Sequence, residues 1–297
     1  MPPMNMINIM ADLYFVGQNK KLPVDWKQPQ GKESGQGSST DKAANYANAF
    51  TASEKMGVPE PLCYFWPAST NKLHVDTCKE IGGKMKEFVH NMLSAVKEAH
   101  DIWRLQAKIK DLKVMSVSAI GTPGCLDGPK LNIKSMPSAM KMSGWGKNIQ
   151  KWIDAVSDGV ADCFEQWQKK VMVPGLPFYP PFAAYPLASA APVPNVPFPL
   201  ITCPSPMMMK MTQVELQKAM VGKLDGGIKK KDTDKHYEAA FGAIGMALSL
   251  AFLMWLPSQQ IMNVLGKGPV PSYAPPYVPV GPILGGDNIP VPGHLAA

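Results

Sequence analysis

The chain has 297 residues and a formal net charge of +7, and 45% of its residues are hydrophobic but only 18% are charged. Its thirty prolines are about twice the usual ~5% share, whereas the hydrophobic share is that of a folded chain, so the composition excludes a fully disordered protein. Arg104 is its one arginine, and because arginine forks read bases and phosphates, the composition also argues against sequence-specific nucleic-acid binding. With so few charges, we expect apolar surface that partner subunits cover.

The first segment, residues 1–67, is predicted to be an N-terminal arm followed by a Gly/Ser-rich linker at 28–40. The start lacks a basic region and carries Asp12 within its apolar run, which is not the pattern of a secretory signal peptide. Residues 14–17 are the plausible strand of this arm, and residues 41–55 predict a short helix.

The second segment, residues 68–142, is predicted to contain a long helix and a Gly/Pro connector. Thr77 and Glu80 form a capping box, and apolar residues then recur at steps of three and four, which predicts a helix from Thr77 to about Ile109. Residues 112–120 are partly alternating and β-branched, so they predict either a strand or a hydrophobic connector.

The third segment, residues 143–206, is predicted to be a tryptophan-rich helix over 143–171, capped by Ser143, and then a proline-rich arm. Trp145, Trp152 and Trp167 lie on one apolar stripe of that helix. The arm from residue 174 onward is dense in proline, which favours an extended chain. Its many aromatic residues predict an arm that lies on a protein surface.

The fourth segment, residues 207–297, is predicted to be an apolar helix and a proline-rich C-terminal arm. A short helix begins at a Thr212–Glu215 capping box, residues 223–234 read as a charged loop, and Thr233 caps the last helix. Pro257 is expected to kink or end that helix, and residues 258–266 to add a further turn.

The uncharged run at 239–256 has two interpretations. It is near the lower length limit for crossing a membrane, and its small residues are those that membrane helices use for close packing. It is also the only such run, which favours a buried helix within an oligomer. The fold class expected is therefore mainly α, with long amphipathic helices joined by extended proline-rich arms and few or no strands.

No catalytic motif is legible, because the usual hydrolase, zincin, nucleotide and dinucleotide patterns are all missing. We therefore expect no enzyme, no cofactor and no metal. Asp154, Asp158 and Asp162 recur every fourth residue, and such a row is expected to face solvent or the lysines of a neighbouring helix. The cysteines are widely spaced and odd in number, which predicts reduced, mostly buried thiols, with an oxidised pair left open: Cys63, Cys78, Cys125, Cys163 and Cys203.

The segments VPGLPFYPPFAAYPLASAAPVPNVPFPL and GKGPVPSYAPPYVPVGPILGGDN each follow a helix. This alternation, together with the missing enzyme motifs, resembles virion structural proteins of tailed bacteriophages, particularly tail, baseplate or collar components. The resemblance covers mainly residues 170–297 and rests on style rather than on an invariant motif. It implies a structural subunit whose partners are copies of itself and other structural proteins, located in the virion after synthesis in a host cytoplasm.

Two other functions stay open. One is a membrane-anchored or membrane-active protein that inserts residues 239–256, with the lysines of the 223–234 loop at anionic headgroups. The other is an adaptor whose proline blocks bind SH3-like grooves. For the structural reading, the candidate subunit-interface residues are Trp145, Trp152, Trp167, Phe178, Tyr179, Phe182, Tyr185, Phe252, Trp255, Tyr273 and Tyr277.

Overall fold

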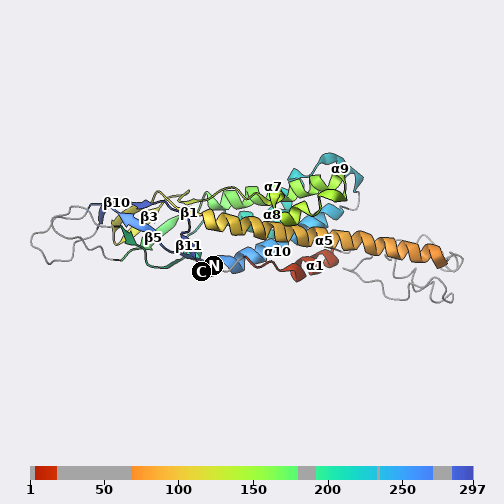
Figure 1. Cartoon of the computed structure of the whole chain (residues 1–297), viewed down its shortest axis with the longest axis horizontal. Coiled ribbons are helices and arrows are strands. Elements are labelled where there is room, and N and C mark those ends of the chain that lie inside the picture. The colour runs from red at the N-terminus through yellow and green to blue at the C-terminus, as the bar shows by residue number, and fades with distance from the viewer. Residues whose placement is uncertain (1–3, 19–67, 180–191, 233–234, 270–282, 297) are drawn as a thin grey trace, which may run out of the picture.

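The computed structural model describes residues 4–18, 68–179, 192–232, 235–269 and 283–296, and the molecule is elongated, with helices along one part and strands at the other (Figure 1). The helices are α1 (Asn8–Gly17), α5 (Ala68–Gln106), α6 (Pro137–Met140), α7 (Lys147–Gln168), α8 (Gln213–Lys223), α9 (Gly226–Lys231) and α10 (His236–Ser258). Short 3-10 turns lie at Ile133–Ser135, Ser143–Trp145, Leu200–Thr202 and Met208–Met211. The first part of α5 extends past the ends of the other helices (Figure 1).

Helix α10 is the core of the helical part. It packs against α1, α5 and α8, and 72% of its most apolar window is buried inside the chain. Gly242 makes one of these contacts possible, because a Cβ placed there would lie 2.5 Å from the ring of Tyr14 in α1. The expectation that partner subunits must bury this run is therefore wrong for most of its surface, since the chain's own helices cover it.

Aromatic rings fill the junction between α5, α7 and α10. Trp103 meets Phe164 edge to face with ring centroids 4.8 Å apart, and Trp167 meets Phe252 in the same way at 4.9 Å. His100 lies against Trp255 at 4.6 Å. Such large buried rings contribute much of the apolar area that holds the three helices together.

The strands form a curled six-stranded antiparallel sheet in the order β5-β3-β2-β10-β9-β6. Its strands are β2 (Lys113–Ser116), β3 (Ser118–Gly121), β5 (Val173–Pro177), β6 (Val193–Pro194), β9 (Leu265–Lys267) and β10 (Ile283–Ile289). Its two edges meet at a bridge between Phe178 and Asn195, where the N–H of Val196 donates to the carbonyl of Pro177 at 2.8 Å.

Two smaller sheets lie at the junction with the helices. The three-stranded sheet has the order β11-β8-β7, and its strands are β7 (Phe198–Pro199), β8 (Gln260–Ile261) and β11 (Leu295–Ala296). Strand β1 (Lys108–Ile109) pairs with β4 (Leu126–Asp127).

The C-terminal segment ties the helical part to the strands. The N–H of Leu112 donates to Oδ1 of Asn288 at 3.0 Å, and Nδ2 of Asn288 donates to the carbonyl of Ile109 at 2.8 Å. The N–H of Ile109 donates to Nδ1 of His294 at 2.8 Å. These bonds satisfy the backbone that follows the end of α5, where the chain turns from helix to strand.

The expectation of few or no strands is wrong. Proline cannot donate to a ladder, so a proline-rich segment is unsuited to the middle of a sheet but suited to its edge. The structure places proline in this way: Pro177 lies in the edge strand β5, Pro194 in the opposite edge strand β6 and Pro199 in the edge strand β7. The central strand β10 contains no proline.

Several predicted boundaries in the first half of the chain are corrected. Residues 14–17 end helix α1 and do not form a strand. Helix α5 begins at Ala68 and not at Thr77, and ends at Gln106. Of the two readings of 112–120, the strand is confirmed, as the β2–β3 hairpin. The short helix expected at 41–55 lies outside the described residues.

Corrections follow in the second half as well. Ser143 begins a 3-10 turn, and Gly146 precedes α7 in the place expected for Ser143. Helix α9 replaces half of the expected charged loop, and α10 begins at His236, with Thr233 outside the described residues. Pro257 lies in the last turn of α10, and strands β8 and β9 follow where a further helical turn was expected.

Candidate functional site: the Trp152 groove

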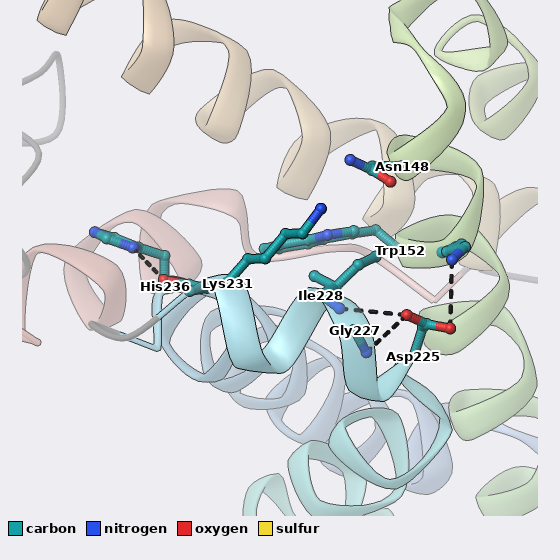
Figure 2. A pocket seen from close by; sticks show the side chains of 9 residues that line it. Asn148, Trp152, Asp225, Gly227, Ile228, Lys231 and His236 are labelled. Carbon is teal, nitrogen blue, oxygen red and sulfur yellow. Dashed lines mark hydrogen bonds and ion pairs between the residues drawn. The ribbon is translucent and has the colours of Figure 1, made fainter.

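A groove lies where the N-terminal end of α7 meets α5 and α9, and we name it the Trp152 groove. One hollow of ≈ 480 Å³ lies between α7 and the α9–α10 turn, and its lining is drawn in Figure 2. A second of ≈ 500 Å³ lies between α7 and α5, and a smaller apolar one of ≈ 150 Å³ reaches Met85 and Phe88. Trp152 lines all three hollows, so they adjoin.

The turn before α7 shapes one wall of the groove. Gly146 has φ 113° and ψ 167°, a conformation that is essentially restricted to glycine. The turn sets the 3-10 segment Ser143–Trp145 beside the first turn of α7, so Trp145 and Ile149 line the same hollow. Trp145 is partly exposed there.

Trp152 is held in place from behind by two rings. Its ring meets Phe88 of α5 with centroids 5.6 Å apart and an interplanar angle of 89°, and Phe241 of α10 at 5.4 Å and 70°. Edge-to-face packing of this kind fixes the orientation of a ring. The half-buried indole therefore gives the groove a rigid apolar wall.

Asp225 holds α9 against α7. Its Oδ1 accepts from the N–H groups of Gly227 at 2.9 Å and Ile228 at 3.2 Å, which is an N-cap, and its Oδ2 lies 3.3 Å from Nζ of Lys151 (Figure 2). The hydrogen bond from Lys151 and the capped N–H groups lower the pKa of Asp225. This carboxylate stays ionised, and its two oxygens bind the N–H groups of α9 and the ammonium of Lys151 in α7.

Asp232, at the other end of α9, also has both carboxylate oxygens bound within the protein. Its Oδ1 lies 2.7 Å from Nδ1 of His236 and its Oδ2 accepts from the N–H of Tyr237 at 3.1 Å. Burial would raise the pKa of Asp232, but the hydrogen bonds from His236 and the backbone outweigh it and the pKa is lowered. Both groove carboxylates therefore hold the α9–α10 turn in place.

Two polar side chains of the groove make no such bond. Among the described residues, the amide of Asn148 has no side-chain hydrogen bond and the ammonium of Lys231 has no ion pair. Figure 2 shows the two pointing toward one another from α7 and α9, with the ring of Trp152 beneath Lys231. These are the groups that a ligand in the groove would meet.

The predicted interface residues divide into four sets. Trp145 and Trp152 line the groove. Four are buried in the chain's own core, Trp167, Phe178, Phe252 and Trp255, while Tyr179 is 49% exposed beside the curled sheet. The remaining predicted residues lie outside the described residues: Phe182, Tyr185, Tyr273 and Tyr277.

Three groove residues were not predicted from the sequence: Asn148, Asp225 and Lys231. The available signal was the sequence DGGIKKK at 225–231, in which an aspartate N-cap precedes a helix that ends in lysines. Its two glycines favoured a loop instead. The helix forms because Asp225 is bonded both to the first N–H groups of α9 and to Lys151.

Two of the three aspartates in the α7 row face lysines, as predicted, whereas Asp154 accepts a hydrogen bond from Nε2 of Gln150 at 3.1 Å. Asp162 lies 2.5 Å from Lys130 and 2.7 Å from Lys223, and Asp158 lies 3.9 Å from Lys134. Burial opposes ionisation of Asp162, but the hydrogen bonds from its two lysines lower the pKa. Among the described residues, no group of three His, Cys, Asp or Glu side chains is arranged to hold a metal ion.

The described cysteines are free and buried, as predicted for Cys125, Cys163 and Cys203. Burial raises the pKa of Cys125 and Cys163 to about 11 and that of Cys203 to about 12. Because the thiolate is the reactive form, these thiols are poor nucleophiles near neutral pH. They belong to the core and not to the groove.

Comparison with known proteins yields no relative: no protein-family model, no curated protein and no solved structure matches the chain. The fold itself defines a helical bundle built around one apolar helix and joined to a curled antiparallel sheet with proline at its edges.

Proposed function

We propose that this chain is a non-enzymatic structural subunit of a large assembly, of the kind found in tail, baseplate or collar of tailed-phage virions, and that it associates with copies of itself. The phage assignment is supported by the style of the proline-rich segments. The assembly role is supported by an exposed apolar surface, and the proposal depends mainly on that observation.

That surface is the α1/α10 face, defined by Ile9, Leu13, Leu253 and Met254. All four side chains are more than half exposed, and they come from two helices that pack against each other. Ile9 and Leu13 are four residues apart on α1, so they share one side of that helix. Half-buried Met246 and Leu250 continue the same side of α10. An apolar face of this kind favours association.

A second copy fits this face because a two-fold interface requires a self-complementary surface. Apolar side chains of leucine, isoleucine and methionine on both copies satisfy that requirement without charge pairing. Methionine adds flexibility that lets such surfaces adjust to one another.

The groove supports a non-enzymatic role. Its two carboxylates are engaged in caps and ion pairs, and their pKa values are lowered. The large pKa shifts belong instead to core groups: burial lowers the pKa of His100 to about 4 and raises the pKa of Cys203 to about 12. Enzymes usually place such perturbed groups in the reacting pocket.

Membrane insertion is the second candidate, because α10 is long and apolar enough to cross a membrane by length and composition alone. Insertion would require α1 and α8 to leave the surface that they bury. The exposed apolar side chains of the α1/α10 face could also bind to the surface of a bilayer, with less apolar area than a spanning helix would bury.

Sedimentation velocity of the purified chain over a range of concentrations tests the proposal. We expect reversible self-association of the wild type and a monomer for the Leu253→Lys/Met254→Lys double variant, because two lysines would be buried facing their copies in the interface. The matched control is Met209→Lys/Val214→Lys, which changes two equally exposed side chains near the start of α8.

The proposal fails if the wild type stays monomeric, or if both double variants reduce association equally. Flotation with liposomes is run in parallel. A wild-type chain that floats, together with a Leu253→Lys/Met254→Lys variant that does not, would favour the membrane candidate in place of the self-associating subunit.

A further inference from the structure

The Trp152 groove has an apolar floor and a cationic rim. The smallest hollow is lined by Met85, Phe88 and Ile149 together with the indoles of Trp145 and Trp152. These side chains come from α5, α7 and the turn before α7, and the edge-on contacts of Trp152 hold the floor in shape. A pocket of this chemistry takes an aliphatic or aromatic side chain.

The charge of the rim is positive. Lys84 lines the hollow between α5 and α7, while Lys151 and Lys231 line the hollow beside α9. The two carboxylates of the groove do not offset this for a ligand, because Asp225 is bonded to Lys151 and Asp232 to His236. An entering group therefore meets the ammonium of Lys231, which sits in the last turn of a helix that ends in three lysines.

Between the floor and the rim lies Asn148. Its amide offers both a donor and an acceptor, and it lines both large hollows. A main-chain peptide group has the complementary pair. The amide is thus placed to bind the backbone of a chain that runs along the groove.

We propose that the Trp152 groove binds an acidic segment of a partner subunit, with an aliphatic or aromatic side chain of that segment in the apolar floor and a carboxylate of the segment at Lys231. The inference rests on the proposed function in that the partner is another subunit of the assembly. Two adjoining hollows, each of the volume usual for a small ligand, make a groove that suits several residues of chain better than one small molecule.

Fluorescence anisotropy with a labelled peptide tests this inference on the full chain. The probe alternates pairs of glutamate with leucine around a central phenylalanine, and a second peptide replaces every glutamate with lysine. We expect saturable binding of the glutamate peptide, no saturable binding of the lysine peptide, and weakening as salt is raised, since the exposed charge pairs are screened.

The deciding comparison is between two neighbouring lysines of α9. Lys231→Glu reverses a charge that lines the groove, whereas Lys230→Glu reverses an exposed charge one residue away that does not line it. Both substitutions remove a lysine from the last turn of α9, so each loses the same favourable interaction with the helix dipole. We expect Lys231→Glu to weaken peptide binding about tenfold or more and Lys230→Glu about twofold or less, in line with the short range of screened surface charges.

Trp145→Ala removes part of the apolar wall without touching the core, because Trp145 is partly exposed. We expect it to weaken the glutamate peptide about tenfold, as truncation of an aromatic anchor does in many interfaces. Met140→Ala, an exposed apolar change outside the groove, is the control and should leave binding unchanged. Thermal melts of all four variants separate lost binding from lost folding.

Equal effects of Lys230→Glu and Lys231→Glu would overturn the inference, and so would no saturable binding of the glutamate peptide. Binding of a DNA duplex that competes with the peptide, and that both lysine variants weaken equally, would replace it with nonspecific polyanion binding. Because self-association depends on the α1/α10 face, Lys231→Glu should still self-associate. A wild-type chain that self-associates but does not bind the glutamate peptide would therefore reject this inference alone and leave the proposed function standing.

Discussion

His100 and His294 are imidazoles buried in the core, and burial is the main cause that lowers the pKa of each to about 4. Neither ring nitrogen of His100 has a hydrogen-bond partner among the described residues. Nδ1 of His294 accepts from the N–H of Ile109, so a proton on that nitrogen would remove the bond. Both rings are therefore neutral in the folded chain near neutral pH.

This burial predicts acid sensitivity. The unfolded chain binds protons at a pKa near 6.5 and the folded chain only near 4, so stability is fully present above pH 6.5 and is lost as the pH falls toward 4. We expect a loss of about 3 kcal/mol per histidine over that interval. Urea unfolding at a series of pH values measures it.

His100→Phe is the variant that isolates one ring. A phenyl group keeps the contacts with Trp103 and Trp255 but cannot be protonated. We expect the decrease in unfolding free energy between pH 6.5 and 4 to fall by about half, because His294 still contributes. An unchanged decrease would show that His100 is not a source of the acid sensitivity.

At the scale of the elements, α7 and α8 cross closely at Gly159. A Cβ added there would lie 2.8 Å from the backbone nitrogen and Cα of Met220. Backbone cannot rotate away as a flexible side chain can, so the helices must separate. We expect Gly159→Ala to lower the free energy of unfolding by about 1–3 kcal/mol, as overpacking does in other cores, measured by urea denaturation.

Gly222→Ala in α8 is the matched control. An added Cβ meets nothing within 4 Å at Gly222, so the substitution adds only helix propensity. We expect it to be neutral or to stabilise by up to about 1 kcal/mol. Destabilisation of both variants to the same extent would contradict the close crossing at Gly159.

The helices were more predictable than their ends. Regular apolar spacing located α5 and α7, because burial on one side of a helix leaves a pattern in the sequence. An uncharged apolar run located α10, which is buried on most sides. The first turns were misplaced because capping depends on backbone geometry. Thr212 does precede α8, but its hydroxyl donates to the carbonyl of Met209 and accepts no N–H of the helix. Glu215 pairs with Lys210.

At the scale of the whole molecule, strand pairing was the least predictable feature. Strand β10 pairs with β2, which lies far earlier in the chain, at the register Asp287 to Lys113. The local sequence pattern does not identify a partner strand so far away in the chain. Proline in β5 and β6 also argued against strands, although edge strands need few backbone donors. The groove was unpredictable for the same reason, since α5, α7 and α9 meet there only through tertiary packing.

The tryptophan stripe of α7 shows which part of the packing could be predicted from the sequence. Its apolar spacing predicted burial correctly, but it could not tell a neighbouring chain from another part of the same chain. The structure buries Trp167 and Trp255 against each other, with ring centroids 6.3 Å apart, and leaves only Trp145 and Trp152 at a groove. Among the described residues, the surfaces that we propose for partners are therefore the α1/α10 face and the Trp152 groove.

Hydrogen–deuterium exchange of the full chain at low and high concentration tests the central claim most directly. We expect concentration-dependent protection confined to residues 8–17 and 246–258, because these carry the α1/α10 face. The Leu253→Lys/Met254→Lys variant should show no such protection. Exchange that is independent of concentration in these two segments would contradict the account.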